Sequence, residues 1–201
     1  MVAAAIVAAC TSGPPPPVAD AGAYERTIAD YRARKDEAFR AADNIDSPIP
    51  IADRGRFPGL VYYPVDPAYH VPASLRDERP DPPNVIELQT SLNTRRRMRK
   101  AGTLTFTVSG AAYTLTAFAD VDQRTPTRLF VPFGDVTNLD ATYRGGRYLD
   151  LDRTPTGLYD LDFNRAYHPF CVYSPSYECP VPPRENRLAA AILAGERLGP
   201  K

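Results

Sequence analysis

The sequence LTFTVSGAAYTLTAF, residues 104–118, determines the fold class of this protein. In its first half Phe106 and Val108 alternate with threonines, and its second half alternates in the same way through Tyr113. Such alternation puts every second side chain on one face of a strand. Ser109 and Gly110, between the two halves, form a typical two-residue turn. The stretch therefore predicts a hairpin in an antiparallel sheet.

Further short runs with strand-like composition lie on both sides of this hairpin, separated by proline, glycine, aspartate and asparagine. With the hairpin, the candidate strands are 60–63, 84–89, 95–98, 103–108, 112–118, 128–131, 148–151 and 159–162. Short strands at this spacing are typical of all-β domains. We expect a mainly β fold with flanking helices, in which an antiparallel sheet is rolled or closed into a small barrel.

A helix is expected on each side of the sheet region. Residues 23–42 show apolar side chains at helical spacing with charged residues between them, which predicts an N-terminal amphipathic helix. Its apolar residues are Tyr24, Ile28, Tyr31 and Phe39. Residues 184–196 follow two prolines, which often begin a helix, and predict a short C-terminal helix. Its apolar stripe would be Leu188, Ile192 and Leu193.

Composition indicates one domain and excludes some partners. The chain has 201 residues, enough to bury one hydrophobic core. It has 24 basic and 24 acidic residues, so the net charge gives no sign of nucleic-acid binding, and we expect no such partner. The glycine motifs that hold dinucleotides or phosphates are absent from the sequence, and no cofactor is predicted.

The N-terminus resembles a bacterial lipoprotein signal. Residues 2–9 are small and apolar, and the sequence VAAC at residues 7–10 is similar to a lipobox, in which Cys10 would be lipidated. No lysine or arginine precedes the apolar run, so an ordinary cleaved signal is the second interpretation and a cytoplasmic protein the third. The run is too short for a transmembrane helix, which needs about 20 residues.

This interpretation sets the expected domain organisation and location. The segments are a signal and lipobox at 1–10, a proline-rich linker at 11–22 and a single domain at 23–198. We expect the domain to be tied to the membrane through a lipid at Cys10. It would belong to the bacterial cell envelope and face the periplasm or the cell surface.

Two charged segments are open to more than one interpretation. The basic run TRRRMRK, residues 94–100, would carry charge on both faces of a strand, which favours an edge or protruding hairpin over binding to lipid headgroups or cell-wall polyanions. The acidic series could bind calcium or act in acid/base chemistry, but turns and Arg–Asp pairs explain it with fewer assumptions. Its members are Asp135, Asp140, Asp150, Asp152, Asp160 and Asp162.

The stretch YHPFCVYSPSYECPVPPRENRL, residues 167–188, contains Cys171 and Cys179. In an exported protein these cysteines favour a disulfide that closes a short loop. A zinc site with His168 is the second interpretation, because these three ligands fall short of the usual four. Free thiols are the third interpretation. We predict the disulfide and no metal site.

Several segments together resemble the bacterial family of unknown function DUF1684. They are LFVPFGDVTN, GRYLDL, DFN and YHPFCVYSPSYECPVPPRENRLAAAILAGE, with matching pieces upstream in SPIP, FPGLVYYPVD and the AGTLTF hairpin. The resemblance covers residues 24–196. It implies a shared architecture but no activity and no proven role for any residue. The motif residues carried over are Asp135, Tyr143, Arg147, Asp162, Asn164, Tyr167, Cys171, Tyr173, Cys179, Pro180, Glu185 and Asn186.

The sequence favours a non-catalytic lipoprotein with a binding β domain whose ligand is a small molecule, a glycan or another envelope protein. Candidate binding residues are Asp135, Tyr143, Arg147, Asp162, Asn164, Tyr167, His168, Glu185 and Asn186. The alternative is a hydrolase or metal-dependent enzyme in which Asp162, His168 and Glu185 converge. A structural component without a pocket is the third possibility, and a flat apolar patch would be its sign.

Overall fold

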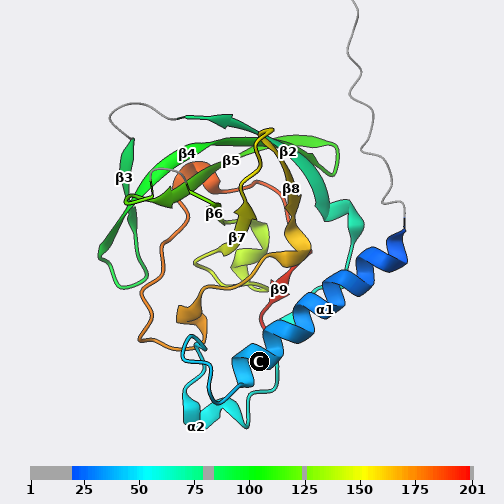
Figure 1. Ribbon diagram of the computed structural model, residues 1–201, viewed down its shortest axis with the longest axis vertical. Coiled ribbons are helices and arrows are strands. Elements are labelled where there is room, and N and C mark those ends of the chain that lie inside the picture. Colours follow the sequence, from blue (N-terminus) through cyan, green and yellow to red (C-terminus); the bar gives the residue numbers. More distant parts are fainter. Residues whose placement is uncertain (1–19, 79–83, 124–125, 200–201) are drawn as a thin grey trace, which may run out of the picture.

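The computed structural model describes residues 20–78, 84–123 and 126–199. Its main feature is a seven-stranded antiparallel sheet that curls into a nearly closed barrel (Figure 1). The strand order is β7-β6-β5-β4-β2-β8, and β3 pairs with β4 outside this path. The predicted mainly β fold is therefore confirmed. The strands are β2 (His70–Asp77), β3 (Val85–Gln89), β4 (Arg95–Val108), β5 (Ala111–Asp120), β6 (Arg128–Phe133), β7 (Arg147–Asp152) and β8 (Leu158–Asp162).

The predicted hairpin is the joint of β4 and β5. Ser109 and Gly110 both have positive φ angles, 50° and 77°, as a tight hairpin turn requires. From this turn the two strands pair with Val108 opposite Ala111 and Leu104 opposite Leu115. Leu104 and Leu115 are fully buried in the core that fills the barrel. The alternating apolar residues of the sequence thus predict correctly which face of the hairpin is buried.

Two of the predicted strands, 95–98 and 103–108, are parts of the single long strand β4. An irregularity between Lys100 and Gly102 separates them without ending the strand. A side chain at Gly102 would collide with the backbone oxygen of Arg76 in the neighbouring β2. The glycine therefore permits close packing of two strands where the sequence suggests a break.

Strand β2 is not among the strands predicted from the sequence, and it contains Pro72, a residue that is rare inside sheets. Pairing explains why the proline is tolerated. The contact of β2 with β4 begins at Ala73, opposite Phe106, so Pro72 precedes the part of β2 that pairs with β4. A proline has no backbone N–H, and no ladder hydrogen bond is lost where no strand lies opposite its nitrogen.

The predicted N-terminal helix is α1 (Ala21–Arg40), and it lies along one side of the barrel (Figure 1). The carboxylate of Asp20 accepts a hydrogen bond from the backbone N–H of Ala23 and caps its first turn. Tyr24, Ile28 and Phe39 are buried, as the periodicity predicts. The helix covers the seam, which we define as the line along which the end strands β7 and β8 of the sheet face each other.

Small elements complete the structure. A two-stranded sheet pairs β1 (Val61–Tyr62) with β9 (Glu196–Arg197), so the C-terminus returns to the segment that follows the first helices. The short helices are α2 (Ile51–Arg54), η1 (Pro67–Tyr69), η2 (Val136–Leu139), η3 (Phe163–Arg165), η4 (Phe170–Val172) and η5 (Arg184–Asn186).

The helix predicted over residues 184–196 is limited to the single turn η5, and the chain beyond it is irregular as far as β9. We call residues 187–196 the C-terminal strap. Its backbone is hydrogen-bonded to the barrel: the N–H of Leu188 donates to the carbonyl of Gly134 at 2.8 Å, and the N–H of Val136 donates to the carbonyl of Ala190 at 3.1 Å. Leu188 and Ile192 are buried as expected, but in an irregular segment, and Leu193, the third residue of the expected apolar stripe, is exposed.

Asn186, at the end of η5, joins two strands that scarcely pair with each other. In the described residues β5 and β6 share one register pair, Phe118 with Phe130. The side-chain oxygen of Asn186 accepts from the N–H of Thr116 at 2.7 Å, and its amide donates to the carbonyls of Thr116 and Pro132 at 2.8 and 2.6 Å. A fully buried side chain thus supplies hydrogen bonds that a strand would otherwise provide.

Replacing Asn186 with alanine should lower the free energy of unfolding by about 3 kcal/mol, because it leaves buried backbone groups without partners. Asn186→Asp should also be destabilising, since a carboxylate accepts from Thr116 but cannot donate to the two carbonyls. Denaturant unfolding measures both. The exposed neighbour Glu185 is the control, and Glu185→Ala should change stability by less than about 0.5 kcal/mol. Equal effects of Asn186→Ala and Glu185→Ala would contradict this role.

Candidate ligand-binding site

Arg147 and Asp135 form a buried ion pair inside the structure. Their side chains are 0% exposed, and Arg147 Nη2 lies 2.8 Å from Asp135 Oδ2. The same guanidinium donates to the carbonyls of Ile192, Ala194 and Glu196 in the C-terminal strap. Asp135 also caps η2 by accepting from the N–H of Thr137. These two candidates therefore hold the strap to the barrel, while Arg147 Nε is buried without a hydrogen-bond partner among the described residues.

Asp162 and Asn164 are buried where β8 meets α1. The hydroxyl of Tyr24 donates to Asp162 at 2.7 Å, and the amide of Asn164 donates to the hydroxyl of Tyr24 at 2.9 Å. Asn164 also binds the backbone N–H and carbonyl of Asp66. The Tyr24 ring stacks on His70 at 5.0 Å between centroids. This cluster fixes the first turns of α1 on the barrel.

His168 is buried, and both of its ring nitrogens have neighbours. Nε2 accepts from the backbone N–H of Tyr143 at 3.2 Å, and Nδ1 lies 3.7 Å from the carboxylate of Glu196. Burial, together with the nearby cations Arg147 and Lys35, lowers the pKa of His168 to about 3. The imidazole is therefore neutral at physiological pH and acts as an acceptor for the backbone.

Glu196 connects His168 to α1. Its carboxylate is 1% exposed and lies 2.5 Å from Lys35 Nζ. It also accepts from the backbone N–H of His168 at 2.7 Å and from the hydroxyl of Tyr173 at 3.0 Å. Glu196 was not among the candidate residues, since the sequence placed it only at the end of the expected C-terminal helix.

Tyr167 is half-buried and bonded to Asp150, a residue that lines a hollow open to solvent. Its hydroxyl donates to Asp150 Oδ2 at 2.8 Å, and Lys35 Nζ lies 4.5 Å from the centre of its ring. Asp150 is exposed along one side, yet the protein around its carboxylate raises its pKa above the ordinary value, mainly by desolvation. The Tyr167 hydroxyl and the cation of Arg128 partly offset this effect. Through Asp150, Tyr167 is thus connected to an accessible space.

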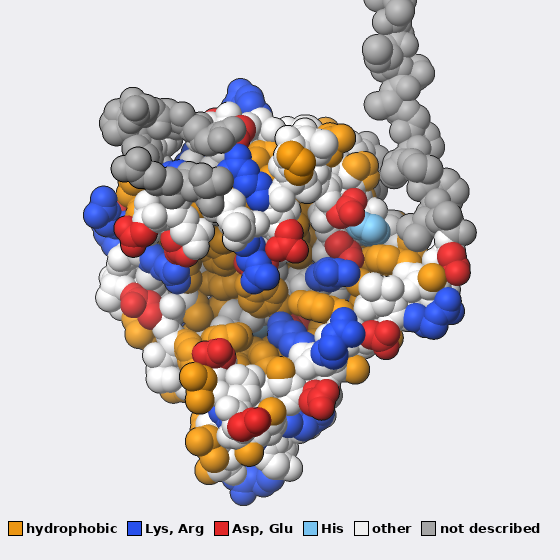
Figure 2. All heavy atoms as spheres, viewed as in Figure 1, with side chains coloured by type: hydrophobic (Ala, Val, Ile, Leu, Met, Phe, Trp, Pro, Cys, Tyr) orange, Lys and Arg blue, Asp and Glu red, His pale blue; other side chains and the backbone are white. Residues whose placement is uncertain are grey.

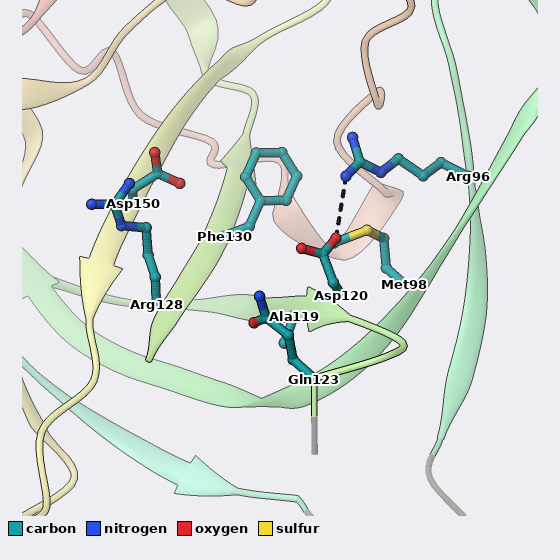
Figure 3. Close-up of a pocket in the computed structure, with 8 residues that line it drawn as sticks. All are labelled: Arg96, Met98, Ala119, Asp120, Gln123, Arg128, Phe130 and Asp150. Atoms are coloured by element: carbon teal, nitrogen blue, oxygen red, sulfur yellow. Dashed lines mark hydrogen bonds and ion pairs between the residues drawn. The ribbon is translucent and has the colours of Figure 1, made fainter. Parts of the chain in front are cut away.

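We call that space the central hollow. It has a volume of 250 Å³ and lies between β4, β5, β6 and β7. Figure 2 shows hydrophobic side chains at the floor of a recess in the middle of this face, with basic and acidic side chains around it. The residues lining the hollow, drawn in Figure 3, are Arg96, Met98, Ala119, Asp120, Gln123, Arg128, Phe130 and Asp150.

The floor and rim of the central hollow differ in chemistry. Met98, Ala119 and Phe130 supply apolar surface, and Met98 also packs with Phe118 in a small core outside the barrel. At the rim Arg96 is paired with Asp120 at 3.2 Å (Figure 3). Arg128 approaches Asp150 on the other side of Phe130 and reaches Asp152 at 3.6 Å.

A second space, the seam cavity, adjoins the first. It measures 440 Å³ and lies at the seam between β7 and β8 beneath the first turns of α1. Tyr24, His70, Tyr159 and Asp162 are among its lining residues. Asp150 lines both spaces, so the Tyr167–Asp150 hydrogen bond stands at their common boundary.

The two cysteines lie together but are free thiols, so the predicted disulfide is not present in the structure. The backbone N–H of Cys171 donates to Cys179 Sγ at 3.2 Å, and Cys171 Sγ donates to the hydroxyl of Tyr143 at 3.8 Å. Among the described residues, no group of three His, Cys, Asp or Glu side chains is placed to hold a metal ion. The zinc interpretation also loses His168, whose ring nitrogens face Tyr143 and Glu196.

The proposed catalytic group of Asp162, His168 and Glu185 is not assembled. Asp162 is bonded to Tyr24, and His168 lies against Glu196 and Tyr143. Glu185 is exposed and lines a separate surface recess with Thr105 and Tyr113. No contact joins the three residues in the part of the chain that the structure describes.

The basic run lies on the hairpin of β3 and β4. Arg95 pairs with Glu87 at 3.1 Å, and Arg96 pairs with Asp120 as described above. Met98, in the middle of the run, is 3% exposed and belongs to the floor of the hollow. The run therefore contributes to the candidate site in a way that its charges did not suggest.

The fold and these spaces define a small antiparallel barrel with a helix over its seam and a solvent-accessible hollow beside it. The family model DUF1684, described as a protein of unknown function, matches residues 55–197. The chain therefore belongs to the DUF1684 family.

A solved structure is similar to this protein along most of both chains. It is the solution NMR structure of an uncharacterized protein from gene locus rrnAC0354 of Haloarcula marismortui, which is 37% identical. The match has a TM-score of 0.67 and covers 88% of this chain and 95% of that chain. No curated protein matches. Among the described residues, no helix is long and apolar enough to cross a membrane.

The depressed pKa of His168 predicts a specific pH dependence. An unfolded histidine binds a proton below about pH 6.5, whereas His168 in the folded protein resists protonation down to about 3. The unfolded state therefore binds the additional proton, and stability is lost as the pH falls through this window. Between about pH 6 and pH 4, the free energy of unfolding should fall about 2 kcal/mol more in the wild type than in His168→Gln.

Denaturant unfolding at each pH measures this difference. The chain has two histidines, so His70→Gln is the matched control and should keep the steep fall of the wild type. Parallel curves for the wild type and His168→Gln would show that His168 is not the group responsible.

Proposed function

We propose that this protein is a non-catalytic, lipid-anchored ligand-binding protein of the cell envelope and that the central hollow receives its ligand. One observation carries the proposal: an accessible apolar floor with a polar rim stands beside a second cavity. Pockets of this kind, with few polar groups over apolar surface, are typical of small-molecule sites. In contrast, the residues considered for catalysis are separated.

The rim of the hollow limits the class of ligand. Two arginines, Arg96 and Arg128, face two aspartates, Asp120 and Asp150, so the charges balance. A strongly charged molecule of either sign would meet as much repulsion as attraction. We therefore expect a neutral or zwitterionic molecule with an apolar or aromatic body, which would pack on Met98 and Phe130.

The size of the hollow favours a small molecule over a glycan chain or a protein. Its volume of 250 Å³ suits one compact molecule, and the adjoining seam cavity of 440 Å³ could receive an extension of it. Asp150 stands where such a ligand would pass from one space to the other. Its carboxylate, held by Tyr167, is the polar group best placed to orient the ligand.

The methyl group of Met98 provides a direct test. The sequence contains two methionines, Met1 and Met98, so protein labelled with ¹³C-methyl methionine should give one signal from the hollow. We expect neutral and zwitterionic aromatic fragments to shift this signal. Phe130→Ala should weaken binding about tenfold, by removing buried aromatic surface from the contact.

Two controls make the experiment decisive. Met98→Leu assigns the signal, and Leu139→Ser, at an exposed side chain of η2, should leave binding unchanged. The proposal fails if no fragment shifts the Met98 signal. It also fails if fragments that shift the signal bind Phe130→Ala as tightly as the wild type.

Lipid attachment is a separate part of the proposal, and Cys10 lies outside the described residues. In a bacterial host supplied with an alkyne-labelled fatty acid, the full chain should acquire the label and sediment with membranes. Cys10→Ala should abolish both results, whereas Cys171→Ala should abolish neither. An unlabelled chain in the soluble fraction would contradict the lipid anchor without affecting the ligand site.

A further inference from the structure

The two free thiols are placed to react with each other. Besides the contact of the Cys171 N–H with Cys179 Sγ at 3.2 Å, their side chains lie within hydrogen-bonding range. Cys171 follows Phe170 in η4, and Cys179 precedes Pro180, which is bridged to Thr90. A bond between the sulfurs would therefore join two segments that already touch.

The surrounding fold stands without such a bond. The carbonyl of Cys179 accepts from the N–H of Ser91 at 2.8 Å, and its N–H donates to the hydroxyl of the same serine at 3.1 Å. On the other side, the N–H of Tyr173 closes the η4 turn onto the carbonyl of Phe170 at 2.9 Å. The loop between the cysteines is short, so closing it removes little entropy from the unfolded chain. Structure and loop length therefore both allow the bond to form and break without unfolding.

The thiols can also be reached from outside. Both line a cavity of 340 Å³, in which Cys171 is half-buried and Cys179 is buried. The charged side chains that line this cavity in the described part of the chain are Arg144 and Arg187. Neither is in an ion pair among the described residues. A small anionic reagent would therefore be attracted to the cavity and meet Cys171 first.

We propose that Cys171 and Cys179 form a thiol–disulfide exchange site for small anionic disulfides. The thiolate of Cys171 attacks one sulfur of the disulfide R–S–S–R, which forms the mixed disulfide Cys171–S–S–R and releases R–S⁻. The thiolate of Cys179 then attacks the Cys171 sulfur, which forms the Cys171–Cys179 bond and releases a second R–S⁻. The two thiol protons end on the two released thiolates. The protein dithiol is thus oxidised by two electrons and the small disulfide is reduced.

The two steps should differ in rate. Burial raises the pKa of the Cys179 thiol to about 12, so its reactive thiolate is scarce. Cys171 is more exposed, and its S–H lies against the hydroxyl of Tyr143. We therefore expect the mixed disulfide at Cys171 to accumulate before the internal bond replaces it. This site does not depend on the ligand-binding function proposed above.

The full chain carrying Cys10→Ser tests the proposal, because Cys171 and Cys179 are then its only cysteines. The probe is oxidised glutathione, and intact mass after an acid quench follows the reaction. The protein should first gain one glutathionyl group and then lose it, ending two hydrogens lighter than at the start. Cys179→Ser should stop at the glutathionyl adduct, and Cys171→Ser should react more slowly than Cys179→Ser.

A neutral disulfide separates the role of charge from that of the thiols. Arg144→Ala should slow the reaction with oxidised glutathione about threefold or more and leave the reaction with 2-hydroxyethyl disulfide unchanged. In mixtures of reduced and oxidised glutathione, both forms of the protein should be populated at intermediate ratios.

Three outcomes would overturn the proposal. In the first, the folded protein is inert although the urea-unfolded protein reacts. In the second, an internal disulfide forms but excess reduced glutathione does not open it, which would identify a structural bond. In the third, the two cysteine-to-serine variants form adducts at equal rates, which would show that the cavity does not direct the reagent to Cys171.

Discussion

The buried carboxylate of Glu196 is the interaction on which the arrangement of this protein depends. It binds Lys35 of α1, the backbone N–H of His168 and the hydroxyl of Tyr173. It so connects the helix, the C-terminal strap and the segment that contains Cys171. Burying a carboxylate is costly unless it is paired and hydrogen-bonded, and here all three partners are present. The carbonyl of the same residue accepts from Arg147, which carries the network into the barrel. Removing Glu196 would leave Lys35 without its anion and three segments without their common anchor.

This network explains why chemically suggestive residues serve the structure. Asp135, Arg147 and Asn186 hold the strap and the strands next to it through buried hydrogen bonds that a ligand would have to displace. Such displacement would leave buried polar groups unpaired, which costs more than most small ligands could supply. A binding site is therefore better sought where polar groups are open to solvent. In this structure that place is the central hollow, which Tyr167 and Asp150 connect to the buried network.

Local patterns in the sequence predicted the elements that local interactions determine. The β4–β5 hairpin and α1 appear with the expected buried faces because alternation, a tight turn and helical periodicity act over a few residues. The strap has a helical spacing of apolar residues, but its backbone pairs with Gly134 and Val136, far away in sequence. The sequence did not predict the floor of the hollow either, because that floor is also formed by residues far apart in the sequence. Met98 and Phe130 become neighbours only when β4, β5 and β6 are assembled, and neither residue type signals a site by itself.

Tyr148 joins the two accessible sites physically. Its ring contacts Phe130 of the central hollow at 4.7 Å between centroids and Tyr167 at 5.7 Å, while the same residue lines the cavity of the cysteines. Its hydroxyl donates to the carbonyl of Pro180, next to Cys179, so the ring cannot turn without breaking a buried hydrogen bond. Packed interiors transmit displacement because they contain little free space. One side chain therefore contacts both Phe130 of the hollow and the residue next to Cys179, although the sites differ in chemistry and open at different places.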